Sequence, residues 1–485
     1  MDIGSIALGI MLVMGYVLLF IGIFLMILAV FDIPIERNYR KNKHITPTFS
    51  LIAPSHNEEK VIERTIKIFL ETIDYPMDKK EFLVINDGST DKTAEIVMKY
   101  AGKIITAETG EVKIIPGKYK NVVLVNRAVG GKGKAFVNND GIKYSTGEIV
   151  FIIDADIQVD RNAFRIAASH FSDKSVVAVS GYVYAKETNG LWNKFIISEY
   201  IMGQKILRRG FNFIGIHYVI PGGCAIMRRS TIQKVGDYSS DTLAEDTDFS
   251  WRIVIETKGK VNFDPSIKVI ADEPSTIIDL WNQRVRWARG NLEVTWKHRH
   301  KVGRLRYGKA TTHTYPFWIT SQIMPIVFLM STGAVVIVTI TGSNLLSFTH
   351  VLALILGIVF YVSSFAVIGI AKGRYWLETL LTPGIPIVVS LTASMFLREG
   401  IVGLLNNVTG SNAGTTIGLI LGVWFIIALP GTYFCLWLAR KGHMKAANII
   451  QLAVFGFWMF SIACTFEAYV KELSKSDRVW IRTVR

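Results

Sequence analysis

The sequence predicts an α/β domain, with helices on both faces of its sheet, inserted between α-helical membrane segments. Uncharged stretches at residues 3–31, 310–371, 400–439 and 446–466 are each long enough for a membrane helix, which needs about 20 apolar residues. Between them, residues 33–309 alternate charged and apolar segments, as a water-exposed domain does. A chain of 485 residues also exceeds one ordinary core, so more than one unit is expected.

The first uncharged stretch is expected to remain as a membrane helix. Its apolar core is longer than that of a secretory signal, and no basic residue precedes it. Basic residues follow it instead: Arg37, Arg40, Lys41 and Lys43. Because basic flanks stay on the cytoplasmic side, we expect the amino terminus outside and the large domain on the cytoplasmic side of the cell membrane.

The formal net charge of +15 indicates an anionic partner. Two partners fit: anionic lipid beside membrane-facing loops, or an anionic substrate such as a nucleoside diphosphate. Nucleic acid does not fit, because no base-reading module accompanies the basic residues. Cys224, Cys435 and Cys464 stand far apart without metal-ligand spacing, which argues against a disulfide framework or a zinc site.

From Pro47 onward, short apolar runs alternate with helical stretches. The predicted strands are 49–54, 82–85, 121–125 and 149–153, and the predicted helices are 58–70, 93–100 and 134–144. Such alternation predicts a mainly parallel sheet, with ligands at the carboxyl ends of its strands. Two later stretches, 187–215 and 274–305, combine apolar faces with basic flanks, as helices at a membrane interface do.

Acidic residues follow the first two predicted strands. After 49–54, Glu58 can bind a nucleoside, and Asn57 can equally cap the following helix. After 82–85, Asp87 stands in a turn sequence that is ordinary on its own. Because the carboxyl ends of parallel strands form the ligand edge of a sheet, these acids are candidates for one binding site.

Asp154 and Asp156 end the apolar strand 149–153. Residues two apart on a strand point the same way, so both carboxylates can face one ligand. Their oxygens suit Mg²⁺ or Mn²⁺, which would neutralise the diphosphate of an activated sugar; a solvated turn is the alternative. Lys134 closes the glycine-rich stretch 130–134 and could reach a phosphate, but this stretch lacks the Walker spacing and is weak evidence alone.

The pair Glu245-Asp246 follows a glycine turn, Pro221-Gly222-Gly223-Cys224. Inverting sugar transfer needs one carboxylate to take a proton from the acceptor hydroxyl as it attacks the anomeric carbon. Departure of the nucleoside diphosphate needs a metal and cations but no second acid. Asp246 is therefore the candidate base, and an acid at a helix start is the open alternative.

Gln283, Arg286 and Trp287 form a QxxRW pattern shortly before the chain becomes apolar. On a helix these positions share one face, and they combine a hydrogen-bonding amide, a phosphate-pairing guanidinium and an indole platform for a sugar. An interfacial helix with a snorkelling arginine is the alternative. The position after the candidate base and before the membrane favours an acceptor site.

The motifs, taken in order, resemble those of the processive, membrane-integrated family 2 glycosyltransferases: Asn86-Asp87-Gly88-Ser89-Thr90-Asp91, Gly133-Lys134-Ala135, Asp154-Ala155-Asp156, Glu245-Asp246 and QxxRW. That family includes synthases of poly-N-acetylglucosamine, hyaluronan, chitin and cellulose. The resemblance covers residues 1–310 well. The stretch 222–229 looks most like the poly-N-acetylglucosamine synthases, whereas His56 and Asn86 depart from the usual family residues and blur the identity of the donor.

The resemblance implies a GT-A type fold with a Rossmann-like mixed sheet and a UDP-sugar donor. The implied donor-site roles are uridine binding by Ala53, Glu58 and Asp87, diphosphate binding by Lys134 and Asp154, and a metal, Mg²⁺ or Mn²⁺, on Asp156. Asp246 would be the base, with Glu245 beside it in the substrate site. The implied contacts with the diphosphate and the acceptor sugar come from Gln283, Arg286 and Trp287.

The last residues are similar to the segment with which such synthases close over bound nucleotide, with Trp480, Thr483 and Arg485 at the matching positions. A basic, disordered tail is the alternative. A cytoplasmic tail requires an even number of spans after the domain, and four fit: 313–340, 347–371, 412–439 and 446–467. The stretch 375–405 is then an interfacial helix, and the basic loop 440–445 faces outside, against the positive-inside tendency.

These observations predict five units: a transmembrane helix at 1–32, a cytoplasmic catalytic domain at 33–273, interfacial helices at 274–312, a transmembrane bundle at 313–470 and a gating tail at 471–485. The predicted function is a processive inverting β-glycosyltransferase that polymerises a sugar, leaning to N-acetylglucosamine, and moves the polymer across the membrane. Its expected partners are the UDP-sugar, the growing polysaccharide and the bilayer; the need for accessory subunits stays open. One alternative moves a single sugar to a polyprenyl-phosphate lipid, and another is a nucleotide-binding transporter or receptor.

Overall fold

The computed structural model describes residues 45–314 and 413–476, together with 27–33 and a few single residues: Phe24, Leu25, Trp318, Gln322, Ile323 and Glu378. For 413–426 it describes the backbone alone. Several predicted features therefore lie almost wholly outside the described residues: the helix 1–32, the spans 313–340 and 347–371, the interfacial helix 375–405, and the tail residues Trp480, Thr483 and Arg485.

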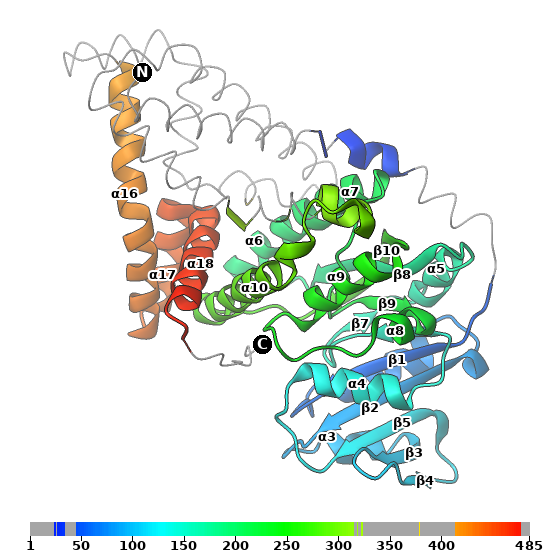
Figure 1. The fold of residues 1–485 in the computed structure, drawn as a ribbon. Helices are drawn as coiled ribbons and strands as arrows, with labels where there is room; N and C mark the ends of the chain where they lie inside the picture. The colour runs from blue at the N-terminus through cyan, green and yellow to red at the C-terminus, as the bar shows by residue number, and fades with distance from the viewer. Residues whose placement is uncertain are drawn as a thin grey trace.

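A single ten-stranded sheet forms the centre of the domain (Figure 1). Its strands are β1 Phe49–Ser55, β2 Lys80–Asp87, β3 Ala101–Thr106, β4 Val112–Ile114, β5 Tyr119–Arg127, β6 Ile149–Ile152, β7 Gln158–Val159, β8 Val176–Ala185, β9 Ala225–Arg228 and β10 Lys260–Ala271. Across the sheet they are ordered β4-β3-β5-β2-β1-β6-β9-β8-β10-β7. The four predicted strands correspond to β1, β2, β5 and β6, which pair in parallel with one another. The predicted parallel core is confirmed.

The other half of the sheet is mixed. β9 runs antiparallel to both β6 and β8, while β10 is parallel to β8 and antiparallel to β7. Since β9 has only four residues, no regular alternation of strand and helix marks this reversal in the sequence. The expectation of a mainly parallel sheet is wrong for this half, and the mixed sheet that the resemblance implies is confirmed.

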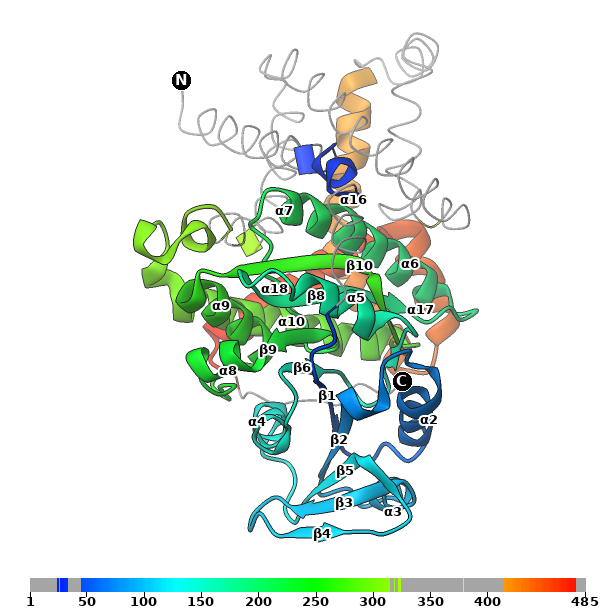
Figure 2. The same cartoon turned by 90° about the vertical axis from the view of Figure 1, so that its right-hand side faces the viewer.

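Helices cover both faces of the sheet, as predicted (Figure 2). One face is covered by α2 Ile62–Lys67, α3 Thr93–Met98 and α5 Ala163–His170, and the other by α4 Lys134–Tyr144, α8 Arg229–Val235 and α9 Glu245–Thr257. Along β1, Leu51 and Ala53 belong to the first apolar cluster, whereas Ile52 belongs to the second. Because both faces are buried, the central strands are continuous apolar runs rather than alternating ones.

Asn57 does not cap a helix. Its backbone is left-handed, with a φ of 55°, and α2 begins only at Ile62. The Asn57 Oδ1 accepts hydrogen bonds from the N–H groups of Thr90 at 2.8 Å and Asp91 at 3.4 Å. Asparagine tolerates this backbone conformation, and here it ties the loop after β1 to the loop after β2. The alternative of a cap at Asn57 was wrong, because a contact between two distant turns determines the conformation of this residue.

A third apolar cluster joins the domain to the C-terminal helices. The stretches 187–215 and 274–305 form α6 Leu191–Tyr200, a π-helical segment Ile201–Arg208, α7 Arg209–Phe213 and α10 Ile277–His298. Of these, α6 and α10 pack against α16 Ala413–Arg440, α17 Met444–Ile450 and α18 Gly456–Leu473. Trp192 of α6 and Trp281 of α10 both contact the Phe460 ring of α18, with centroid distances of 4.9 and 5.6 Å.

Two of the predicted spans, 412–439 and 446–467, are helical, the first as α16 and the second within α17 and α18. Among the described residues, one helical segment, Met444–Leu473, is long and apolar enough to cross a membrane. Half of its apolar window is buried against protein. A buried core helix of a water-soluble protein can have the same length and composition.

Candidate active site

Acidic and basic side chains meet around one glycine turn. The Asp246 carboxylate, in the first turn of α9, accepts a hydrogen bond from the Gly222 N–H at 2.7 Å. Lys134, the first residue of α4, donates to the Asp154 carboxylate that follows β6. A Cβ atom on Gly222 would lie 3.2 Å from both Asp246 Oδ2 and Lys134 Nζ, so a larger residue would crowd them. We refer to Lys134, Asp154, Glu245 and Asp246 as the acid–lysine cluster.

The charges in this cluster depend on one another. Burial lowers the pKa of Lys134, but the Asp154 and Glu245 carboxylates outweigh it, so the pKa is raised. Burial raises the pKa of Glu245, and the adjacent Asp246 carboxylate raises it further. The positive charges of Lys134 and Arg286 act on Glu245 in the opposite direction. Lys134 is therefore a stable cation among acids, and Arg286 of the QxxRW pattern is brought within electrostatic range of them.

Asp87 is held at the end of β2 by a partner that the sequence analysis missed. Arg127, the last residue of β5, places its Nε 3.2 Å from Asp87 Oδ1 and its Nη1 2.9 Å from Asp140 Oδ2. The Gly131 N–H of the glycine-rich stretch donates to Asp87 Oδ2 at 3.2 Å. Arg127 reaches Asp87 because β5 lies beside β2 in the sheet, and no local pattern could have revealed that pairing.

The remaining predicted donor-site residues differ in how they are placed. Asp156 is 8% exposed, and Arg64 of α2 donates to its main-chain carbonyl at 3.0 Å. Glu58 lies in the turn before α2, where its N–H donates to Thr93 Oγ1 at 2.8 Å. Ala53 is fully buried with its side chain in the apolar core. The structure therefore does not bring the Ala53 side chain to the acid–lysine cluster, and any ligand contact there must use the backbone.

The QxxRW residues all lie on α10 but differ in burial. Gln283 is 2% exposed, with its Nε2 3.4 Å from a carboxylate oxygen of Glu273, whereas Trp287 is 36% exposed. Arg284, which the sequence analysis did not single out, places its guanidinium 4.4 Å from the Trp287 ring centroid. It also donates to Glu199 at 2.6 Å. Trp287 thus has a supported and partly exposed ring, which a stacking platform requires.

α10 also supports the loop immediately before α9, the helix whose first turn carries Asp246. The Leu243 N–H donates to Glu293 Oε2 of α10 at 2.7 Å. At Gly290 the helix and the loop approach so closely that a Cβ on Gly290 would lie 2.6 Å from the Ala244 Cβ. These two contacts hold the residues immediately before Glu245 and Asp246 against the helix that carries the QxxRW pattern.

Asp248 connects the start of α9 to the end of α10 through charged contacts. It is fully buried, with His298 Nε2 at 2.8 Å, Lys297 Nζ at 2.9 Å and Arg252 Nε at 3.0 Å from its carboxylate. Burial acts to raise the pKa of Asp248, but these partners outweigh it and lower the pKa to about 2. A carboxylate so strongly held as an anion suits a structural role rather than proton transfer.

The same helix is tied to the end of α18. Arg289 is 6% exposed and donates to the Glu472 carboxylate and to the Ser476 carbonyl. Its Nε also lies 4.0 Å from Glu293, which holds the Leu243 N–H. Polar contacts therefore run from the last described helix, through Arg289 and Glu293, to the loop immediately before Asp246. The sequence analysis missed this connection because its members are distant in the chain.

Comparison with known proteins identifies the family. Two family models match, Glycosyl transferase family 2 over residues 50–236 and Glycosyl transferase family group 2 over residues 149–377. The probable glycosyltransferase YdaM of Bacillus subtilis is 30% identical over 308 residues, which cover 62% of this chain and 70% of that protein. The chain is a family 2 glycosyltransferase. The transferase is thus an enzyme of glycosyltransferase family 2, as the motifs predicted.

The transferase is also similar to a polysaccharide synthase. It is 29% identical to the poly-beta-1,6-N-acetyl-D-glucosamine synthase of Staphylococcus epidermidis over 246 residues, which span 50% of the transferase and 55% of the synthase. Among solved structures, the mannosyltransferase PcManGT from Pyrobaculum calidifontis, in complex with GDP-Man and Mn2+, is 19% identical with a TM-score of 0.49. That comparison covers 80% of the transferase and 99% of the other chain.

Proposed function

We propose that the transferase is a processive inverting β-glycosyltransferase that adds sugars of the N-acetylglucosamine type from a UDP-sugar to a growing polysaccharide and moves it across the membrane. The observation that carries this proposal is the acid–lysine cluster, in which the Asp246 carboxylate is held on the Gly222 N–H. It combines a proton acceptor, a cation and further acids at the edge where the parallel strands of the mixed sheet end. The similarity to a poly-β-1,6-N-acetyl-D-glucosamine synthase supports the choice of sugar.

In the proposed reaction, Asp246 takes the proton of an acceptor hydroxyl while that oxygen attacks the anomeric carbon of the donor. The new bond joins the acceptor oxygen to the sugar. The bond from the anomeric carbon to the diphosphate breaks, and its electron pair leaves with the nucleoside diphosphate. Lys134 and Arg286 stabilise the negative charge that develops on this leaving group.

The donor is proposed to bind along the ends of β1, β2 and β6. Glu58 and Asp87, with the Ala53 backbone, would hold the uridine, and Asp156 beside Asp154 would hold Mg²⁺ or Mn²⁺. Proteins bind Mg²⁺ through one or two carboxylates together with substrate phosphates. This pair fits that rule, although the described residues contain no group of three metal-ligating side chains. When bound, the metal would neutralise charge on the diphosphate.

The acceptor sugar is proposed to stack on Trp287, beside the other QxxRW residues. The partly exposed ring that Arg284 supports favours this placement. The packing of α10 against α18 supports a route from the acceptor site towards the bilayer, since α18 belongs to the segment apolar enough to span it. Trp480, Thr483 and Arg485 are proposed to close over bound nucleotide from the cytoplasmic side.

Substitution of the proposed base tests the reaction. We expect Asp246→Asn to lower the rate of sugar transfer about 10³-fold, as loss of a general base does, while UDP binding stays near that of the wild type. Transfer is measured as UDP release, and binding by calorimetry. Asp237→Asn, the same change at an exposed acid a few residues upstream, is the control and should transfer normally. A variant at Asp246 that transfers normally, or that loses UDP affinity, would contradict the assignment.

The length of the product tests processivity. With UDP-N-acetylglucosamine and purified enzyme, we expect long chains at early times while most donor remains, separated by gel electrophoresis and digested by a β-N-acetylglucosaminidase. Products that carry one sugar on a lipid would establish the non-processive alternative instead. Chelation should abolish synthesis, and added Mg²⁺ or Mn²⁺ should restore it.

A further inference from the structure

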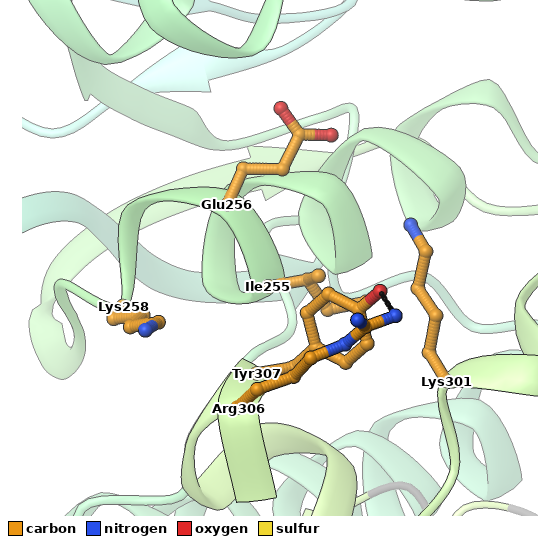
Figure 3. A pocket seen from close by; sticks show the side chains of 6 residues that line it. All are labelled: Ile255, Glu256, Lys258, Lys301, Arg306 and Tyr307. Carbon is orange, nitrogen blue, oxygen red and sulfur yellow. Dashed lines mark hydrogen bonds between the residues drawn. The ribbon is translucent and has the colours of Figure 1, made fainter. Parts of the chain in front are cut away.

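A cavity lies on the domain away from the acid–lysine cluster (Figure 3). Its volume is about 520 Å³, and its lining residues are Ile255, Glu256, Lys258, Lys301, Arg306 and Tyr307. They come from the end of α9 and from the loop that follows α10. Because Asp246 stands at the start of α9, helical rise alone places it about 18 Å from Lys258. The cavity is therefore separate from the proposed donor site.

The cavity carries cations that no described carboxylate neutralises. Lys258, Lys301 and Arg306 have no ion pair with any described acidic residue, whereas Lys297, just before this loop, lies 2.9 Å from the Asp248 carboxylate. Arg306 donates to the Tyr307 hydroxyl at 2.6 Å and leaves its other N–H groups available. The one acid in the lining is Glu256, and Figure 3 shows its carboxylate directed away from Arg306. Three uncompensated cations around one concave surface favour an anionic ligand.

The position of the cavity favours a membrane surface. In Figures 1 and 2, the loop after α10 lies at the end of the domain that also carries α7 and residues 27–33, opposite the edge formed by β3 and β4. Large apolar side chains are exposed at this end, with Leu305 84%, Trp296 69% and Val30 63% exposed. Exposed apolar groups beside cations are typical of surfaces that lie on anionic lipid.

The adjoining sequence has the same character. Six of the thirteen residues from 297 to 309 are Lys or Arg, and the long uncharged stretch 310–371 follows directly. These basic residues act on His300, whose pKa is lowered by desolvation and by Lys301 and other neighbouring basic residues. A basic segment next to an apolar stretch attracts acidic lipids at the cytoplasmic surface.

We propose that the cavity formed by Lys258, Lys301 and Arg306 binds the phosphate-bearing headgroup of an anionic phospholipid. Lys301 and Arg306, whose charged ends lie on the same side of the cavity in Figure 3, contact the phosphate. Lys258, on the opposite side, adds positive charge, and the exposed Leu305 enters the apolar part of the leaflet beside them. This proposal rests on the membrane setting of the proposed function but is independent of the sugar and of the base.

Lipid titration of the full-length protein tests the site. The purified protein in detergent is titrated with phosphatidylglycerol or phosphatidylcholine, and bound lipid is counted by native mass spectrometry. The test variant combines Lys258→Asn, Lys301→Gln and Arg306→Gln, with asparagine chosen because Lys258 has a left-handed backbone, φ 52°. Each cation near a lipid surface is worth about a fivefold change in affinity, so phosphatidylglycerol binding should fall about 100-fold.

The control variant removes the same charge at the far edge of the sheet, with Lys99→Gln, Lys113→Gln and Lys118→Gln, and should bind phosphatidylglycerol as the wild type does. UDP release by both variants shows that the fold and the transfer reaction are intact, which separates failure of this site from failure of the proposed function. Equal retention of phosphatidylglycerol by the test variant would overturn the proposal. So would displacement of the lipid by millimolar inorganic phosphate, since that would identify a site for a soluble anion.

Discussion

The donor side and the acceptor side of the site are built in different ways. On the donor side, Lys134 and Asp154 stand at the start of a helix and the end of a strand, and the edge of the sheet brings them together. On the acceptor side, α10 takes its position from the C-terminal helix α18, through apolar packing and through Arg289 on Glu472. Local sequence therefore sets the chemistry of the donor side, whereas contacts between distant segments set the geometry of the acceptor side.

Asp246 belongs to both sides. Its carboxylate is held by the Gly222 N–H next to Lys134, and the residues before it are held by Glu293 and Gly290 of α10. Removal of a donor-side charge should act on the chemical step itself. Weakening of the contacts around α10 should act on position and stability, with smaller effects on the rate.

After loss of the base itself, the largest effect is expected on the donor side, from Lys134→Met. This change removes the cation beside the leaving group, and sugar transfer should fall about 10²–10³-fold, as loss of one preorganised electrostatic contact does. Glu245 loses a positive neighbour, so its pKa should rise further, and the part of the pH–rate profile that depends on Glu245 should move to higher pH. Steady-state UDP release from pH 5 to 9 measures both changes.

Lys132→Met is the matched control, because Lys132 is exposed and lies two positions away in the same glycine-rich stretch. It should keep the wild-type rate and pH profile. Equal losses in the two variants would show that the stretch acts through its backbone and not through the Lys134 cation, and the contrast between donor and acceptor sides would lose its chemical basis.

This contrast also explains what the sequence could predict. Asp154 and Asp246 could be proposed from the sequence, because Asp154 ends an apolar strand and Asp246 follows a glycine turn in the chain. Arg127 could not be proposed, since its pairing with Asp87 exists only once β5 lies beside β2. The alternative of a helix cap at Asn57 failed for the same reason, because a second loop determines its left-handed backbone.

The sheet shows the same limit. Alternating strands and helices predicted β1, β2, β5 and β6 and their parallel pairing. They did not predict the antiparallel β9, whose four residues form one short apolar run among many. Periodicity identifies elements, but the direction and the neighbours of a strand are decided by tertiary packing.

A smaller effect, on stability, is expected where α9 meets the end of α10. Asp248→Asn removes a fully buried carboxylate from His298, Lys297 and Arg252 and should lower the unfolding free energy by about 3 kcal/mol, as breaking a buried ion pair does. Asp241→Asn, which removes the exposed second partner of Lys297, should cost less than about 1 kcal/mol. Thermal unfolding in detergent measures both.

The pH dependence of unfolding distinguishes the charged contacts of Asp248 from apolar packing. The pKa of Asp248 is lowered to about 2 from 3.8, so its contribution to stability is complete above about pH 4 and is lost as the pH falls towards 2. The thermal midpoint of the wild type should therefore fall more steeply than that of Asp248→Asn across this range. Parallel declines would mean that other carboxylates carry the acid sensitivity.

The smallest effect is expected from the contact between α10 and α18. Glu472→Gln weakens the hold of Arg289 on α18, and kcat should fall about tenfold while KM for the UDP-sugar stays within about twofold, because a displaced base loop slows transfer without altering the donor site. Glu472→Asp, which keeps the charge, should recover part of the loss. Lys471→Gln is the control, since Lys471 pairs within α18 with Glu467 and should leave both constants unchanged. A rise in KM without a fall in kcat would show that this contact acts on donor binding. The donor side and the acceptor side would then no longer differ in the way described above.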